Sequence, residues 1–299
     1  MDLPAISLVT PSFNQARYLE DALRSVHGQG YPRLEHVVMD GGSTDGSAAI
    51  LERWRDRLAH VESAPDGGQY DALQRGFART SGEIMGWLNA DDLHAPWTLS
   101  VVADVFTRFP DVEWITTMYP MIWDDAGRAV HVGYGGAFEA AAFRRGQNLP
   151  GRGWWAGNFV QQESTFWRRS LWERAGARID TGLRLAGDFE LWARFFGHAH
   201  LWAVASVLAG FRMHGDQKTA HHMDAYHEEA ESVLRRYGFV RPGRVRDFLR
   251  ANLTRAVGAR PLVRMPEPLG RALARVGLLA PAPVVWWRGG WERRVDYVL

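Results

Sequence analysis

Cysteine is absent from this chain of 299 residues. Disulfide bonds, thiolate metal sites and a cysteine nucleophile are therefore excluded. The chain also lacks an excess of charge of one sign, because 35 basic and 34 acidic residues give a formal net charge of +1. This balance gives no support to nucleic acid as a partner. Lys218 is the only lysine, so nearly all of the basic residues are arginine.

Long hydrophobic runs are missing as well. No window approaches 18 uninterrupted apolar residues, so we expect no membrane-spanning helix. The first residues, MDLPAISLVT, contain no basic stretch followed by a long apolar run, so we expect no signal peptide and a cytoplasmic protein. With 46% hydrophobic and 12% aromatic residues, the chain can bury one large core or two modest ones.

Two patterns of apolar residues alternate over the first 120 residues: short continuous runs, and residues spaced at the period of a helix. Short apolar runs predict buried strands, and helical apolar spacing between them predicts amphipathic helices. Asn14 is predicted to cap the first helix, and Ser43, Thr44 or Asp45 the second. The alternation predicts an α/β fold with a doubly wound, mostly parallel, Rossmann-like sheet. The predicted strands are at residues 5–10, 36–40, 60–63, 83–88 and 114–118.

Polar residues follow three of the predicted strands, and ligands of such sheets bind at the carboxyl ends of the strands. These ends read Thr10-Pro11-Ser12, Asp40-Gly41-Gly42 and Asn89-Ala90-Asp91-Asp92. Asp40 can accept hydrogen bonds from a ribose hydroxyl or a base N–H; a strand-to-helix turn capped by Asp45 is the alternative. The adjacent carboxylates of Asp91 and Asp92 indicate a divalent metal site, with a solvated loop as the alternative.

Several motifs then resemble a known family. They are SLVTPSFNQARYLEDALRSVHGQGYPRLEHVVMDGGSTDGS, followed by APDGGQYDALQRGFARTSGEIMGWLNADD. In this order and at these separations they resemble family 2 glycosyltransferases with the GT-A fold. The resemblance covers roughly residues 5–215, and it implies transfer of a sugar from a nucleotide-sugar donor.

The resemblance also implies roles by position. Asp92 is the preferred metal ligand for Mn²⁺ or Mg²⁺, and His214, in FRMHGDQKT, is a further ligand or a diphosphate contact. A lone histidine in a loop also fits a purely structural role. Nucleotide or donor contacts are implied for Thr10, Pro11, Ser12, Asn14, Asp40, Gly41, Ser43, Asp66, Tyr70, Asn89 and Asp91.

The segment GDFELWARF resembles the later family motif that contains the catalytic base. Helical spacing places Asp188 on the face of Leu191 and Trp192, where apolar neighbours raise the pKa of a carboxyl and make it a better base. A helix N-cap is the alternative role for Asp188. Many relatives have an acidic residue where Gly187 stands, so Asp188 is the only candidate in the motif, with Glu190 as a weaker alternative.

The second half of the chain is less regular. Residues 133–162 read as loops rich in Gly, Trp and Arg, and we expect Trp154 and Trp155 there to contact the acceptor. Trp154, Trp155 and Trp167 fit a core position equally well. We predict a nucleotide-sugar-binding half at 1–120, an acceptor-binding and catalytic-base half at 121–218, and a helical, Arg-rich C-terminal appendage at 219–299.

The appendage contains fourteen arginines against four acidic residues from Arg235 onward, with Trp286, Trp287 and Trp291 among them. This composition fits a solvated helical face, a peripheral contact with the anionic inner face of a membrane, or an interface with another subunit.

These features predict an inverting, metal-dependent transfer to an acceptor hydroxyl. UDP is the nucleotide by analogy, and a glycan or lipid-linked sugar is the acceptor, as in polysaccharide or lipopolysaccharide synthesis. One alternative is a nucleotidyltransferase that forms nucleotide sugars, but TPSFNQARY lacks the Gly-rich, basic loop that such enzymes use. The other is a non-catalytic relative that only binds sugar nucleotides.

Overall fold

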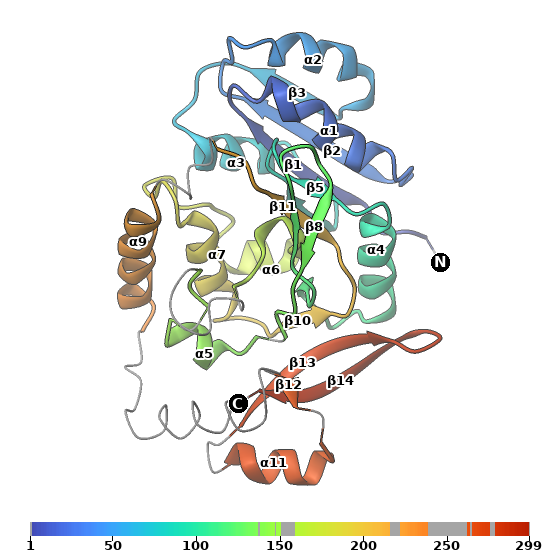
Figure 1. Ribbon diagram of the computed structural model, residues 1–299, viewed down its shortest axis with the longest axis vertical. Coiled ribbons are helices and arrows are strands. Elements are labelled where there is room, and N and C mark those ends of the chain that lie inside the picture. Colours follow the sequence, from blue (N-terminus) through green and yellow to red (C-terminus); the bar gives the residue numbers. More distant parts are fainter. Residues whose placement is uncertain are drawn as a thin grey trace.

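The computed structural model describes residues 2–136, 138–146, 148–150, 159–215, 222–238, 262–263, 265–275 and 279–298. Its centre is a ten-stranded sheet in the order β12-β14-β13-β10-β6-β9-β4-β1-β2-β3 (Figure 1). The strands are β1 (Ile6–Ser12), β2 (Leu34–Asp40), β3 (His60–Ser63), β4 (Ile84–Trp87), β6 (Trp114–Thr117), β9 (Phe166–Arg168), β10 (Leu201–Val204), β12 (Leu262–Val263), β13 (Ala280–Trp287) and β14 (Trp291–Val298).

The N-terminal strands of this sheet are parallel, as the sequence predicts. β1 pairs with β2 and with β4, β2 pairs with β3, and β6 pairs with β10, all in parallel. β9, by contrast, runs antiparallel to both of its neighbours, β4 and β6, as β14 does to β12 and β13. The register pairs Ser12 with Asp40, so the carboxyl ends of β1 and β2 lie side by side. The predicted α/β fold with a mostly parallel sheet is therefore confirmed.

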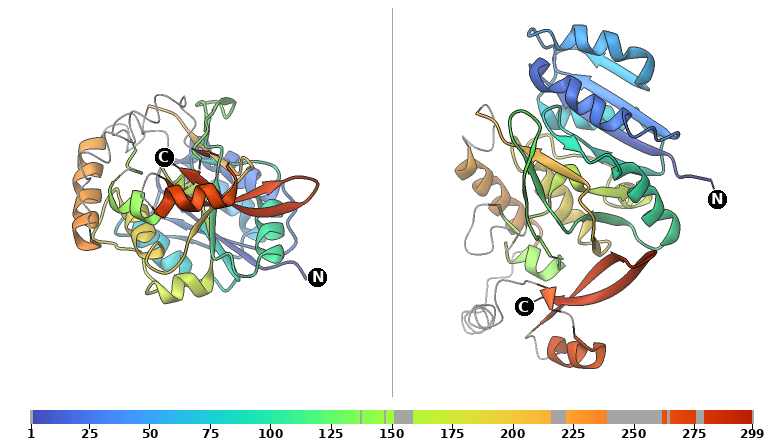
Figure 2. Two further views of the ribbon diagram at one scale, coloured as in Figure 1. Left: turned by 90° about the horizontal axis from the view of Figure 1, so that it is seen from below. Right: turned by 45° about the vertical axis from the view of Figure 1, so that its right-hand side comes forward.

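Helices cover both faces of the sheet because the side chains of each strand alternate between two cores. Val9 of β1 packs with Leu73 and Trp192 on one face, whereas Leu8 packs with Val26 and Val102 on the other. The first core takes α3 (Gln69–Phe77) and α7 (Gly187–Phe195). The second takes α1 (Ala16–His27) and α4 (Thr98–Arg108), while α2 (Ser47–Trp54) packs beside α1 (Figure 2).

Short elements complete the described parts of the chain. A four-stranded sheet, which the sequence does not predict, has the order β5-β11-β7-β8. Its strands are β5 (Leu93–His94), β7 (Met121–Trp123), β8 (Ala129–Val132) and β11 (Ala209–Arg212). The remaining helices are η1 (Arg55–Arg57), α5 (Ala140–Arg144), η2 (Gln162–Ser164), α6 (Arg169–Arg174), α9 (Met223–Arg236) and α11 (Glu267–Arg275).

Asp45 holds the N-terminal ends of two helices. Its Oδ2 accepts the backbone N–H of Ala16 at 2.8 Å in α1, and its Oδ1 accepts that of Ser47 at 3.1 Å in α2. The predicted cap on α1, Asn14, is wrong: its own backbone is left-handed (φ 52°), and its Oδ1 accepts the N–H of Thr44 instead. Asp45 can serve both helices because a carboxylate has two acceptor oxygens.

The prediction of a helical C-terminal part is also wrong in part. Among its described residues lie the helices α9 and α11, but residues 280–298 form the antiparallel hairpin β13–β14. β13 pairs in parallel with β10, so the hairpin extends the main sheet. Trp291 is buried there and Trp286 packs on the core, whereas Trp287 is exposed. None of the helices in the described ranges is long and apolar enough to cross a membrane.

Candidate active site

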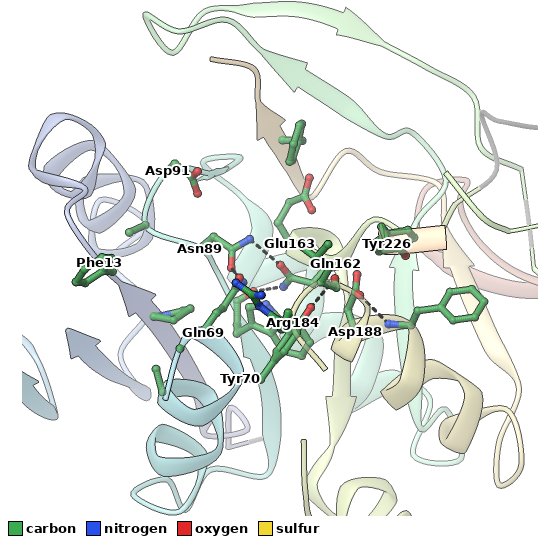
Figure 3. A pocket seen from close by; sticks show the side chains of 18 of the residues that line it. Phe13, Gln69, Tyr70, Asn89, Asp91, Gln162, Glu163, Arg184, Asp188 and Tyr226 are labelled. Carbon is green, nitrogen blue, oxygen red and sulfur yellow. Dashed lines mark hydrogen bonds between the residues drawn. The ribbon is translucent and has the colours of Figure 1, made fainter. Parts of the chain in front are cut away.

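A cavity of about 900 Å³ opens at the carboxyl ends of β1, β2 and β4 (Figure 3). One wall comes from the loops that follow these strands and from the start of α3. The other wall comes from η2, α7 and α9. The first wall contributes Pro11, Ser12, Phe13, Asn14, Gly41, Asp66, Gln69, Tyr70, Asn89 and Asp91, and the second Gln162, Glu163, Asp188, Phe189 and Tyr226.

Asp40 and Thr10 do not line this cavity, although the sequence predicts them as nucleoside contacts. The Asp40 carboxylate is 2% exposed and accepts the Ser43 N–H at 2.9 Å and the Ser63 hydroxyl at 2.6 Å. Ser43 in turn accepts the backbone N–H of Asn14 at 2.7 Å. Thr10 is buried, with its hydroxyl 2.9 Å from Nε2 of His36. Asp40 and Ser43 therefore hold the loops after β1 and β2 in place through hydrogen bonds, and other residues of these loops line the cavity.

The loops present two different polar groups to the cavity, the hydroxyl of Ser12 and the carboxylate of Asp66. Ser12 is 4% exposed and lines the cavity, and its Oγ has no hydrogen-bond partner in the described structure. Asp66 faces Gly41 closely, because a Cβ at Gly41 would lie 3.1 Å from the Asp66 carboxylate. Gly41 leaves space for a ligand to approach the main chain. Ser12 and Asp66 offer that ligand a hydroxyl and a carboxylate as hydrogen-bonding groups.

Asp91 and Asp92 point in different directions. Asp92 is 1% exposed, its Oδ1 accepts the Arg212 backbone N–H at 2.9 Å, and its Oδ2 accepts the Asn89 amide at 3.2 Å. Burial, with Asp91 and Glu163 nearby, raises the pKa of Asp92 well above its usual range. Asp91 instead lines the cavity, with its Oδ2 3.0 Å from Nε2 of His214.

This arrangement disagrees with the preference for Asp92 as the metal ligand. Adjacent residues in a tight turn project to opposite sides, and here the buried side is occupied by Asp92. Asp91 and His214 present one carboxylate oxygen and one imidazole nitrogen at the same place, a donor pair that suits Mn²⁺. Within the described ranges no three acidic or histidine residues cluster in a way that could hold a metal. The pair therefore fits a cation whose remaining ligands come from a bound diphosphate and water.

Asp188 lies in the first turn of α7 and faces the other end of the cavity. Its Oδ1 accepts the Phe189 N–H at 2.7 Å. Burial raises the pKa of Asp188 to about 6, and the nearby Glu229 carboxylate adds to the rise. A carboxyl with this pKa can take up a proton near neutral pH.

Glu190 is not a second acidic group of the cavity. Its side chain is fully buried and accepts three hydrogen bonds from the Arg194 guanidinium at 2.8 to 3.0 Å. Tyr237 also donates to it at 2.6 Å. Glu190 is thus an internal partner of Arg194, which leaves Asp188 as the acidic residue that this helix presents to the cavity.

The structure explains why a residue without a side chain fits at position 187. A Cβ at this position would lie 2.7 to 2.8 Å from three atoms of the Tyr70 ring. Tyr70 is 6% exposed and donates its hydroxyl to the Leu185 carbonyl at 2.7 Å. The ring of Tyr70 therefore occupies the space that a side chain at residue 187 would need.

Gln69, Gln162 and Glu163 are polar residues among those of the cavity that the sequence does not predict. Gln69 donates to Asn89 at 2.8 Å, and the Asn89 amide lies 3.2 Å from the Gln162 carbonyl. Glu163 is 4% exposed, its Oε1 has no partner in the described structure, and burial raises its pKa to about 8. In Figure 3, Glu163 lies between Asp91 and Asp188. The run QQES, polar between two aromatic segments, is the signal that could have revealed this wall.

Of the three tryptophans considered in the second half of the chain, the structure describes only Trp167. Trp167 is fully buried and packs edge-on against Trp87 and Trp192 with ring centroids 5.7 and 5.8 Å apart, so it belongs to the core. Trp154 and Trp155 lie outside the described residues, and their predicted contact with the acceptor stays a prediction.

A doubly wound sheet with an acidic cavity at its strand ends is the architecture of nucleotide-binding α/β enzymes. The family model described as Glycosyl transferase family 2 matches residues 7–154. Through this segment the chain belongs to the family 2 glycosyltransferases, and its fold is GT-A.

Relatives of known sequence agree with this assignment. An uncharacterized glycosyltransferase of Mycobacterium tuberculosis is 41% identical over 90 residues, which cover 30% of this chain and 34% of that protein. The chain thus matches about a third of the length of this relative. An uncharacterized glycosyltransferase of Rickettsia prowazekii is 22% identical over 222 residues, which cover 72% of this chain and 66% of the relative.

Two solved structures share the fold. The S. aureus TarS structure of residues 1–349 in complex with UDP-GlcNAc has a TM-score of 0.60 at 18% identity, covering 78% of this chain and 65% of TarS 1–349. The mannosyltransferase PcManGT from Pyrobaculum calidifontis, in complex with GDP-Man and Mn²⁺, has a TM-score of 0.53 at 19% identity, covering 93% of this chain and 80% of PcManGT.

Proposed function

We propose that this glycosyltransferase moves a sugar from a nucleoside diphosphate sugar to an acceptor hydroxyl with inversion at the anomeric carbon. The observation that carries the proposal is one cavity with two unlike ends. Asp91, whose Oδ2 lies 3.0 Å from Nε2 of His214, is at one end, and the half-buried Asp188, with a pKa of about 6, is at the other. A diphosphate sugar that spans the cavity would place its anomeric carbon between them.

The residues of the chain divide the reaction. Asp188 accepts the proton of the acceptor hydroxyl, whose oxygen then bonds to the anomeric carbon on the face opposite the leaving group. The bond from that carbon to the diphosphate oxygen breaks, and the nucleoside diphosphate leaves with the bonding electrons. Asp91 and His214 would hold a divalent cation, which offsets the charge of the leaving diphosphate when it is bound. Single displacement needs no covalent intermediate on the protein.

A UDP-sugar is the first donor to test, and GDP-mannose the second. TarS and PcManGT, which share the fold, were solved with UDP-GlcNAc and with GDP-Man, respectively. The acceptor proposed here is a sugar hydroxyl of a glycan or a lipid-linked sugar, and the process is the synthesis of a polysaccharide, a lipopolysaccharide or another glycan.

The test is a panel of nucleotide sugars assayed for Mn²⁺-dependent binding, slow hydrolysis and transfer. Asp188→Asn is expected to lower kcat by at least about 100-fold, because general base catalysis contributes 10²- to 10⁴-fold, while donor binding stays near wild type. Asp224→Asn, on the exposed side of α9, is the matched control. Transfer that is unchanged in Asp188→Asn would show that another group is the base.

The wild-type pH profile gives a second test. Asp188 must be deprotonated to act as a base, so kcat/KM should rise with pH through about 6 and then level off. A profile that is flat between pH 5 and 7 would contradict this role. Release of pyrophosphate from a nucleoside triphosphate and a sugar phosphate would indicate a nucleotidyltransferase instead.

A further inference from the structure

A carboxylate of α9 holds the backbone that leads into α7. The side chain of Glu229 accepts the backbone N–H groups of three consecutive residues, Arg184, Leu185 and Ala186. The shortest distances are 3.0 Å to Arg184, 2.9 Å to Leu185 and 2.9 Å to Ala186. Ala186 is the residue that precedes α7, and Asp188 follows it by two positions.

Ala186 is the N-cap residue of α7, and its N–H has no partner within the helix. Glu229 provides that partner. A carboxylate at a helix N-terminus also interacts favourably with the helix dipole. Glu229 therefore supplies from another helix what the Glu of a capping box supplies from the third helical position, an acceptor for the N–H of the N-cap residue, and it also accepts the two N–H groups before it.

The same segment is held from its other side. Tyr70 of α3 donates its hydroxyl to the carbonyl of Leu185 at 2.7 Å. Leu185 is thus fixed by α3 through its carbonyl and by α9 through its N–H. Tyr226, one helical turn before Glu229, also lines the cavity. The position of Asp188 in the cavity consequently depends on both helices.

We propose that Glu229 is a positioning residue for Asp188: it fixes the N-terminal end of α7 and places a fixed negative charge next to the base. The inference rests on the proposed function, in which Asp188 is the base. Glu229 lies beyond residues 7–154, the segment that matches the family model, so α9 contributes to the site from outside that segment.

The charge of Glu229 has a predictable effect on Asp188. The titratable groups that face Asp188 are Tyr70 from α3, Tyr226 and Glu229 from α9, and Glu163 from η2, and the cation Arg184 lines the same cavity. The pKa values of both tyrosines are raised by burial, so these side chains stay neutral. Glu229 contributes, after burial, to the raised pKa of Asp188. Removal of its charge should lower that pKa.

The experiment compares Glu229→Gln with Glu228→Gln in the full-length protein. Glu228 is the exposed neighbour on α9, so its variant changes the same charge outside the site. In Glu229→Gln we expect kcat to fall about 10-fold or more, because a small displacement of a catalytic group is costly. Donor KM should stay within about twofold, and the acidic limb of kcat/KM should move down by roughly half a pH unit. Glu228→Gln should match wild type in all three.

Hydrogen exchange at the amides of residues 184–186 tests the anchor without relying on activity. We expect these amides to exchange faster in Glu229→Gln, and no change in Glu228→Gln. If wild type transfers sugar and Glu229→Gln keeps its kcat, its pH profile and slow exchange, the inference is overturned. If wild type transfers sugar from no donor, the proposed function fails instead, and exchange still decides whether Glu229 holds this segment.

Discussion

The contact between Gly187 and Tyr70 gives a sharp prediction about packing at the base. In Gly187→Ala the new methyl group would lie 2.7 to 2.8 Å from three atoms of the Tyr70 ring. Without this contact, the substitution would stabilise a helix by up to about 1 kcal/mol. Forcing an extra methyl group into a packed site costs about 1–3 kcal/mol. Tyr70 is buried and hydrogen-bonded, so the ring cannot move aside freely, and we expect a net loss of about 1–2 kcal/mol.

The double variant separates this contact from other effects. Tyr70→Ala alone should cost about 3–5 kcal/mol, because it removes a large buried ring. In Tyr70→Ala/Gly187→Ala the space left by the ring accepts the methyl group. The double variant should therefore lose less stability than the sum of the single variants, by about 1–3 kcal/mol. The free energy of unfolding is measured by urea titration, with Gly290→Ala as the control, since a Cβ there meets nothing within 4 Å.

The contact between residue 187 and Tyr70 should also affect catalytic activity. A shift of the α7 N-terminus displaces Asp188, so Gly187→Ala should lower kcat by roughly 10- to 100-fold. Additivity of the two substitutions within about 0.5 kcal/mol would refute the reasoning. So would a Gly187→Ala protein that is more stable than wild type.

Three further predictions concern stability. Asp45→Ala removes one side chain that caps α1 and α2, so it should cost about 2 kcal/mol in urea unfolding, whereas a loss below 0.5 kcal/mol would contradict the double cap. Arg194→Met leaves Glu190 buried without its closest cation and should cost about 3–5 kcal/mol, most of it recovered when Glu190→Gln is added; equal stability of the single and double variants would show that the pair is not coupled. Glu163 has a pKa of about 8 in the folded protein, above its unfolded value, so the stability tied to its proton is lost as the pH rises through about 8. Glu163→Gln should therefore show a smaller fall in Tm between pH 6 and 9 than wild type, and an equal fall would contradict the burial of a titrating carboxyl.

The fold could be predicted from the sequence wherever the hydrophobic period is long enough to read. The strands at His60–Ser63 and Trp114–Thr117 are where the sequence predicts them. β9 has three residues and β5 has two, which is too short to show a period. In β13, Pro281 and Pro283 interrupt an otherwise apolar run, so the sequence gives little sign of a strand in the main sheet.

The site could be predicted as a region better than as a set of contacts. Sequence places Asp91 and Asp92 together, but spacing does not say which carboxylate faces the cavity. That choice is fixed by Arg212, 120 positions away, whose backbone N–H binds Asp92. Glu229 and Tyr70 contact the segment before α7 from two other helices, and no local sequence pattern predicts such contacts. The roles of these residues in transfer remain predictions for the experiments above.

The place of β9 in the sheet bears on how the chain can fold during synthesis. β9 lies between β4 and β6, although it follows β6 by about fifty residues in sequence. A nascent chain that ends at residue 154 would hold β4 and β6 without the strand that joins them. Each would then present an open edge of the kind that invites pairing between chains. The segment that identifies the family is therefore not a unit that can be excised, and its central sheet closes only after Phe166–Arg168 has left the ribosome.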